Sequence, residues 1–132
     1  MFDAILSEYN ALEQEISRKR KAVVEAIKTK FHEPFAKFFE AHEELEALWF
    51  CAYTPYFNDG EECIFSVYET YGVVGDDKYV YGYGDEPVEK SIREADDIVQ
   101  SLPEDVIRGL FGDHVKVVIT RDGVNVEEYD HD

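Results

Sequence analysis

The sequence predicts an α+β fold: a long N-terminal helical arm with a kink at Pro34, then a mainly antiparallel sheet of two hairpins with two short helices between them. Residues 2–31 contain no Gly or Pro and carry apolar side chains at helical spacing. Turn signals at 58–60 and 122–123 each separate runs of aromatic and β-branched residues, and strands do not alternate regularly with helices. We expect a single domain over residues 1–132, with the arm at 1–46 and an acidic α+β body at 47–132.

Apolar residues of the arm recur at Phe2, Ile5, Tyr9, Leu12, Ile16, Val23, Ala26 and Ile27. This spacing predicts a helix with a heptad stripe, roughly 45 Å long, whereas a compact domain of this size is roughly 36 Å across. The helix would therefore overhang its own domain, so it bends, lies across its own sheet, or packs on a second chain as a homodimer. Lys19 and Lys30 fall at core positions of the heptad and weaken the stripe beyond its first half.

A second short helix is expected from Glu33 to Leu45, because Pro34 interrupts the first. The run 48–57 and the run 63–68 then form a hairpin around Asn58-Asp59-Gly60. In that register Cys51 lies opposite Tyr68, so the two cysteines, Cys51 and Cys63, do not face each other and are expected to be free thiols. Pro55 predicts that the first strand is an edge strand, or bulged, near its end.

The remaining elements follow from local signals. Residues 72–85 predict a loop with a third short strand around 78–81. Ser91, with Glu94 three residues later, predicts the N-cap of a helix that runs to Leu102. A further short helix begins at Pro103 and stops at Gly112. The chain closes with a hairpin of residues 115–120 and 124–129.

Charge is the strongest functional signal. The net charge is -17, with seven Lys and Arg against ten Asp and Glu in residues 1–50, and six against twenty in residues 51–132. A field of this sign repels nucleic acid and anionic membranes and attracts basic proteins, such as nucleic-acid-binding enzymes. A face roughly 36 Å across would match about twenty phosphates of duplex DNA, so nucleic-acid mimicry is one interpretation and an ordinary solvated surface is the other. The candidate partner-binding residues are Asp76, Asp77, Asp85, Glu86, Glu89, Asp96 and Asp97.

Catalytic and metal-binding motifs do not emerge from the sequence, so we expect no enzyme activity, no cofactor and no metal site. The acids of the tail, 127–132, could approach Asp113 and His114, but their alternation along a strand does not build a metal site. The alternative function is binding of a small ligand or nucleotide on a stacking wall of tyrosines: Tyr53, Tyr56, Tyr68, Tyr79 and Tyr81. The N-terminus has no signal-peptide pattern and no apolar run could span a bilayer, which predicts a cytoplasmic protein.

Two segments also carry a resemblance. The first is YTPYFNDG at 53–60, followed by CIFSV at 63–67; the second is FGDH at 111–114 with EEYDHD at 127–132. Together they resemble a group of small acidic proteins predicted from tailed-phage and bacterial genomes. The resemblance implies a phage setting in a host cytoplasm, where small acidic proteins often inhibit host enzymes, and it transfers no catalytic residue. We therefore expect a non-enzymatic interaction protein that binds and inhibits a basic host protein.

Overall fold

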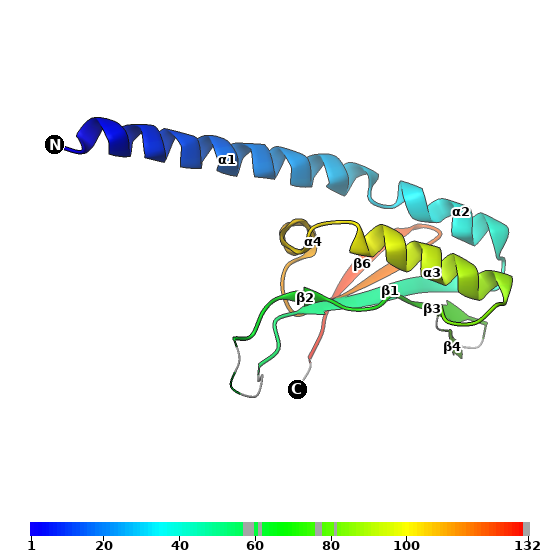
Figure 1. Ribbon diagram of the computed structural model, residues 1–132. Coiled ribbons are helices and arrows are strands. Elements are labelled where there is room, and N and C mark those ends of the chain that lie inside the picture. Colours follow the sequence, from blue (N-terminus) through cyan, green and yellow to red (C-terminus); the bar gives the residue numbers. More distant parts are fainter. Residues whose placement is uncertain (57–59, 61, 76–77, 81, 131–132) are drawn as a thin grey trace. The chain divides into compact units, whose positions relative to one another are not determined.

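The computed structural model describes residues 1–56, 60, 62–75, 78–80 and 82–130 (Figure 1). The chain divides into two compact units, Met1–Phe31 and His32–Asp132, which are described separately. The boundary differs from the predicted division after residue 46, because the second helix has buried residues of the body's core. We call the second unit the body.

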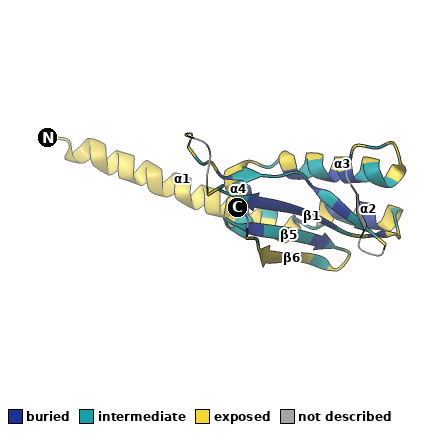
Figure 2. Cartoon of the chain, turned by 90° about the horizontal axis from the view of Figure 1, so that it is seen from below, coloured by how far each residue is buried: buried dark blue, intermediate teal, exposed yellow. Residues whose placement is uncertain are grey.

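The first unit is one helix, α1 (Asp3–Lys30), as the absence of Gly and Pro predicts. No residue of α1 itself is buried, and Figure 2 shows the helix in the colour of exposed residues along its length. The large apolar residues of the heptad stripe from Phe2 to Val23 are between 46% and 64% exposed. A single helix cannot bury its own stripe, so this unit by itself has an unpartnered apolar face.

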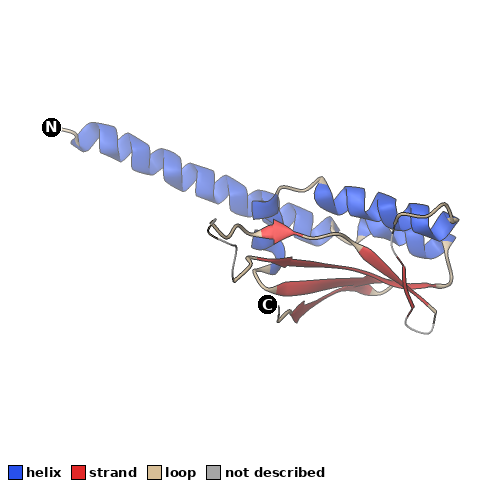
Figure 3. Ribbon diagram, turned by 60° about the horizontal axis from the view of Figure 1, so that its bottom comes forward, coloured by secondary structure: helices blue, strands red, loops and turns tan. Residues whose placement is uncertain are grey.

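The body combines three helices and one antiparallel sheet among its described residues. The helices are α2 (Glu33–Ala41), α3 (Pro87–Gln100) and α4 (Glu104–Phe111); the strands are β1 (Leu45–Tyr53), β2 (Ser66–Val67), β3 (Tyr71–Val74), β4 (Lys78–Val80), β5 (Val115–Thr120) and β6 (Gly123–Glu128). The strand order is β4-β3-β1-β5-β6, and β2 pairs with the end of β1 beyond β3. Helices α2, α3 and α4 all lie on the same face of the sheet (Figures 1 and 3). The body is thus a two-layer α+β unit, which confirms the predicted fold class.

The core lies between this sheet face and the three helices. Alternate residues of the central strands point into it, and Leu48, Phe50, Val117 and Ile119 are fully buried. The helices contribute buried residues at helical spacing: Phe35, Phe38 and Phe39 from α2, Ile92, Ala95 and Val99 from α3, and Ile107 from α4. Gly72 of β3 admits α3 closely, since a Cβ at this position would lie 2.5 Å from Ile92 Cδ1.

The predicted end of the second helix at Leu45 is wrong. α2 stops at Ala41, and His42 is extended with φ -133° and ψ 98°. The Arg121 guanidinium donates to the carbonyls of Phe39, His42 and Glu43 at 3.3, 3.0 and 2.9 Å. A residue 80 positions away therefore satisfies backbone acceptors at and beyond the helix end, which local sequence does not reveal.

The N-cap predicted at Ser91 is also wrong. α3 begins at Pro87, directly after the extended residue Glu86. Proline suits this first position because the first amide of a helix has no intrahelical acceptor. Ser91 instead lies inside the helix, where its hydroxyl hydrogen-bonds to His42 Nε2 at 2.8 Å and links α3 to the end of α2.

The first hairpin keeps its predicted register but has different bounds. Ala52 pairs with Val67 and Tyr53 with Ser66, and the Tyr68 amide donates to the Cys51 carbonyl at 2.9 Å. The turn residues 58 and 59 lie outside the described residues. The prediction that Pro55 marks an edge strand or bulge is wrong, since β1 is central between β3 and β5 and ends before Pro55, and its irregular pairing lies between Leu45 and Ala47.

The other elements largely follow prediction. The third short strand is β4, α4 ends at Phe111 with Gly112 as its C-cap, and β5 and β6 form the closing hairpin. β3 was not predicted as a separate strand; it pairs with β1 on one side and β4 on the other, with Trp49 opposite Tyr71.

Candidate binding face

The face of the sheet opposite α2, α3 and α4 is rich in aromatic residues. Because side chains alternate along a strand, Trp49, Cys51 and Tyr53 of β1 point away from the core formed by Leu48 and Phe50. Their neighbours on this face include Tyr71 from β3 and Lys116 from β5. The helices of the body leave this face open (Figure 3).

One aromatic group lies at the middle of the face. The rings of Trp49 and Tyr71 are 4.7 Å apart and tilted by 43°. Lys116 Nζ lies 4.5 Å from the centre of the Trp49 ring, within the range of a cation–π contact. The face therefore already holds one cation against an aromatic ring.

A second aromatic group lies at the end of β1. The rings of Tyr53 and Tyr68 are stacked 4.3 Å apart, and Tyr129 lies 5.5 Å from Tyr53. Tyr129 is held there by its amide, which donates to the His114 carbonyl at 2.8 Å. Burial, together with a hydrogen bond to Tyr53, raises the pKa of Tyr68 to about 12, so its hydroxyl stays protonated at neutral pH. We define the aromatic face as Trp49, Tyr53, Tyr68, Tyr71, Lys116 and Tyr129.

Cys51 lies on the same side of the sheet but is not poised for nucleophilic chemistry. It is only 6% exposed, and both cysteines are free, as predicted. Burial raises the pKa of the Cys51 thiol, and the opposing effects of the Lys116 charge and a hydrogen bond with Tyr129 are smaller. A protonated, buried thiol is a weak nucleophile.

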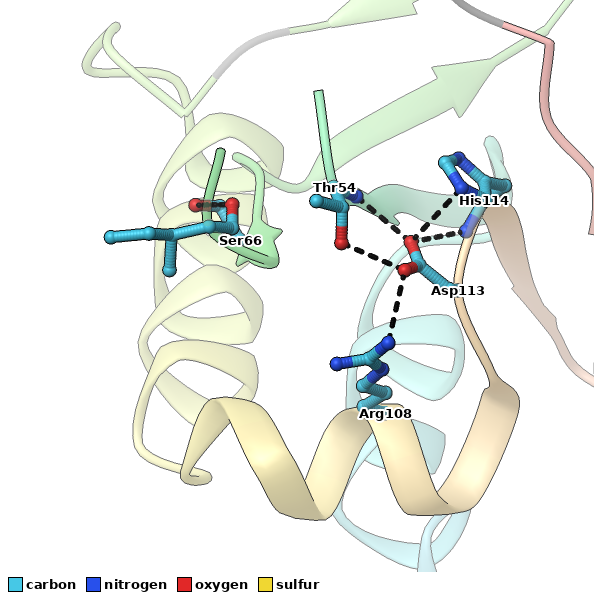
Figure 4. Close-up of polar contacts among 6 residues, drawn as sticks. Thr54, Ser66, Arg108, Asp113 and His114 are labelled. Carbon is cyan, nitrogen blue, oxygen red and sulfur yellow. Dashed lines mark hydrogen bonds and ion pairs between the residues drawn. The ribbon is translucent and has the colours of Figure 1, made fainter. Parts of the chain in front are cut away.

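A polar cluster around Asp113 fixes the chain at the end of the aromatic face (Figure 4). The Asp113 carboxylate accepts hydrogen bonds from the Thr54 amide at 2.8 Å, the Thr54 hydroxyl at 2.7 Å and the His114 amide at 2.8 Å. Arg108 Nη2 lies 3.4 Å from the same carboxylate. The cluster joins the residue after β1 to the turn between α4 and β5.

The electrostatics of this cluster favour an ionised carboxylate. Burial raises the pKa of Asp113, but the hydrogen bonds from Thr54 and His114 and the proximity of the His114 ring outweigh it, so the pKa is lowered overall. His114 adopts a positive φ of 56°, and its ring stacks with Tyr56 at 5.0 Å. These contacts hold Thr54, the residue after Tyr53, and His114, on whose ring Tyr56 stacks.

The predicted stacking wall is brought together only in part. Tyr53 and Tyr68 lie together, whereas Tyr56 stacks on His114 and is 63% exposed. Tyr79 pairs with Val73 through its backbone; its side chain and the whole of Tyr81 lie outside the described residues. Sequence reasoning missed Trp49, Tyr71, Lys116 and Tyr129, although the even spacing of Trp49 and Tyr53 on one strand was a visible signal that they share a face.

Of the predicted acidic residues that the structure describes, those along α3 share its exposed side with basic side chains. Asp85, Glu86 and Asp97 are exposed and Glu89 is half-buried, while Asp76 and Asp77 lie outside the described residues. Asp96 has a structural contact, since its Oδ1 accepts the Thr70 amide at 3.0 Å. By helical spacing, Lys90 and Arg93 lie on the same exposed side of α3 as Glu86 and Asp97.

Negative charge is instead spread over the body. Residues 32–132 contain seven Lys and Arg and twenty-five Asp and Glu, a net charge of -18. Exposed acids outside the predicted set are Glu33, Glu40, Glu43, Glu44, Glu46, Glu62, Glu94, Glu104, Asp105, Asp122, Glu127, Glu128 and Asp130. Five of the basic side chains contact the body's own carbonyls, rings or carboxylate: Lys37, Arg93, Arg108, Lys116 and Arg121. The field around the body is therefore negative on many sides.

Comparison of the chain with protein-family models, with curated proteins and with solved structures finds no match. Within the described part of the chain, no three His, Cys, Asp or Glu side chains are grouped so that they could hold a metal ion. A search of the same residues finds no helix with the length and apolarity needed to cross a membrane.

Proposed function

We propose that the protein is a non-enzymatic interaction protein that binds and inhibits a basic protein partner through its aromatic face. The observation that carries the proposal is the combination of an uncovered, aromatic sheet face with a body of net charge -18. The aromatic side chains of this face are half-buried. Aromatic residues are enriched in protein interfaces, and a negative field accelerates encounters with basic proteins.

The chemistry of the face suits arginine and lysine side chains. A guanidinium placed on a Trp or Tyr ring contributes about 0.5–2 kcal/mol, depending on how far it is desolvated. Lys116 on Trp49 is an intramolecular example of such a contact. The surrounding acids then supply long-range attraction, and the aromatic rings supply short-range contact.

The resemblance to small acidic phage proteins supports a host protein as the partner, and nucleic-acid-handling enzymes are the class with suitable basic surfaces. We assign a steering role to the acids just before α3, Asp85 and Glu86, and to those on the helix, including Glu89 and Asp97. The mixture of Lys90 and Arg93 with these acids favours diffuse attraction over a phosphate-like strip that mimics DNA. The contact itself is assigned to the aromatic face.

The test is titration of the full chain with an Arg-Gly repeat peptide, a Lys-Gly peptide and a Glu-Gly control, followed by calorimetry and Trp49 fluorescence. We expect the basic peptides to bind, more weakly at 500 mM than at 50 mM NaCl, and the acidic peptide not to bind. Tyr71→Leu and Tyr53→Leu should each raise the Kd at least tenfold. The matched control Tyr83→Leu changes an exposed tyrosine not assigned to this face and should alter the Kd less than twofold.

Equal binding of the basic and acidic peptides, or unchanged binding by both face variants, would contradict the proposal. Circular dichroism of each variant separates a lost contact from a lost fold. The native chain and the Tyr53→Leu and Tyr71→Leu variants are then incubated with a bacterial lysate. A host protein that the native chain retains and both variants lose is the candidate partner, and its inhibition is assayed. A thermal shift with nucleotides, removed by the same substitutions, would instead support the small-ligand alternative.

A further inference from the structure

Helix α1 has opposite charges in its two halves. Residues 1–15 carry Asp3, Glu8, Glu13 and Glu15 and no Lys or Arg, a net charge of -4. Residues 16–31 carry Arg18, Lys19, Arg20, Lys21, Lys28 and Lys30 against Glu25, a net charge of +5. The helix as a whole is nearly neutral, so its charge pattern is strongly directional, unlike that of the body.

The apolar stripe of α1 runs through both halves. Phe2, Tyr9, Ile16, Val23 and Lys30 occupy one core position of the heptad, and Ile5, Leu12, Lys19 and Ala26 occupy the other. Only Lys19 and Lys30 interrupt this pattern. This heptad pattern is typical of a coiled-coil seam, in which the apolar positions pack on a second helix.

We propose that α1 pairs with α1 of a second copy of the chain in the antiparallel orientation. In a parallel pair, Lys19 of one helix would face Lys19 of the other, and the two C-terminal halves, each with a net charge of +5, would lie side by side. In an antiparallel pair, the -4 half of each helix faces the +5 half of the other, so charge complementarity acts twice.

An antiparallel register centred on Gln14 also satisfies the core positions. It places Phe2 opposite Ala26, Ile5 opposite Val23, Tyr9 opposite Lys19 and Leu12 opposite Ile16. Lys19 then faces the ring of Tyr9 in the acidic half of the partner, where a cation–π contact is available. All other facing pairs are apolar.

Repulsion between the bodies favours the same orientation. Each body begins at residue 32 and carries a charge of -18. A parallel pair would bring the two attachment points to one end, about 10 Å apart. The antiparallel register separates them by roughly 50 Å along the axis at 1.5 Å per residue, which is several Debye lengths at physiological salt. The dimer would therefore present two aromatic faces on a spacer, as suits a bivalent binder.

The orientation is tested by distance measurement on the full chain with Cys51→Ala, Cys63→Ser and a spin label at Ala4→Cys. The antiparallel pair predicts an axial separation of roughly 30 Å between the two labels, whereas a parallel pair predicts a separation close to the interhelical distance of about 10 Å. Light scattering at 50 and 500 mM NaCl gives the mass, and we expect a dimer that dissociates more readily at high salt. A label distance close to the interhelical value would overturn the orientation.

Charge and seam variants test the interface itself. Glu8→Lys/Glu13→Lys/Glu15→Lys and Arg18→Glu/Arg20→Glu/Lys21→Glu should each weaken the homodimer at least tenfold, and an equimolar mixture should restore pairing. Leu12→Asp/Ile16→Asp should give a monomer. The matched control in the body, Glu86→Lys/Glu94→Lys/Asp97→Lys at the N-cap and along α3, should leave the dimer intact. A monomeric native chain at 100 μM, or a dimer indifferent to the α1 variants, would overturn the proposal. Peptide binding by the monomeric variant reports on the aromatic face separately.

Discussion

Replacing Asp113 by alanine should destabilise the body substantially, because this carboxylate organises the chain at the end of the aromatic face. Its three short hydrogen bonds come from two backbone amides and one hydroxyl, and its side chain is only 20% exposed. The Thr54 hydroxyl can turn to water, but the two amides are held by the backbone. At about 1–2 kcal/mol for each stranded amide, we expect Asp113→Ala to lower the free energy of unfolding by about 2–4 kcal/mol at pH 7.

The same substitution predicts a pH dependence with a definite sign. The pKa of Asp113 is lower in the folded state than its ordinary value of 3.8, so its contribution to stability is present above that value. It is lost as the pH falls below about 4 and through the folded pKa. The difference between the native chain and Asp113→Ala should therefore shrink between pH 5 and pH 2.

The assay is urea unfolding followed by the fluorescence of Trp49, the single tryptophan of the chain. Asp97→Ala is the matched control, since Asp97 is exposed on α3 and should change stability by less than about 0.5 kcal/mol. A loss below about 0.5 kcal/mol for Asp113→Ala at pH 7, or an equal loss at pH 7 and pH 2, would refute the reasoning.

Three further predictions concern the core and the aromatic face. Gly72→Ala should lower the free energy of unfolding, measured in urea, by about 1–3 kcal/mol, because the new Cβ would lie 2.5 Å from Ile92 Cδ1. An unchanged free energy of unfolding would show that α3 shifts freely. The pKa of Tyr68 is raised from 10.0 to about 12, so the unfolded chain loses this proton at lower pH than the folded chain, and the free energy of unfolding should fall between pH 10 and pH 12. The free energy of unfolding of Tyr68→Phe should fall less steeply over this range. Parallel pH profiles of the two proteins would contradict the shift. Cys51 is buried and its pKa is raised, so it should react with iodoacetamide at least a hundredfold more slowly in the folded chain than in 8 M urea. Mass spectrometry of the Cys51 peptide measures the two rates. Comparable rates would disprove the protection of this thiol.

Features with a local cause could be predicted from the sequence. α1 follows from thirty residues without Gly or Pro. The pairing of Ala52 with Val67 and of Tyr53 with Ser66 has the register that the sequence Asp59-Gly60 predicts for a two-residue hairpin. The sequence also carries a local signal for the observed start of α3, because Pro87 is as characteristic of a first helical turn as the Ser91 capping pattern that predicts a later start.

Features with a distant cause could not be predicted. β3 is short and contains Gly72, and it becomes a strand because β1, more than twenty residues earlier, offers an edge to pair with. The aromatic face depends on the same long-range pairing, since Trp49 meets Tyr71 only when β1 and β3 are in register. The contact of Tyr129 with Tyr53 likewise requires the last strand to lie at its place beside β5. The tyrosine-only stacking wall was incomplete for this reason.

The central place of β1 has a consequence for synthesis on the ribosome. β1 leaves the ribosome before its neighbour β5, which begins only after residues 54–114 have been made. At about 5–20 residues per second, this takes roughly 3–12 s, during which one side of an aromatic strand lacks its hydrogen-bonding neighbour. The sheet therefore closes only after β5 has been made, and the excess of carboxylates repels neighbouring nascent chains during that interval.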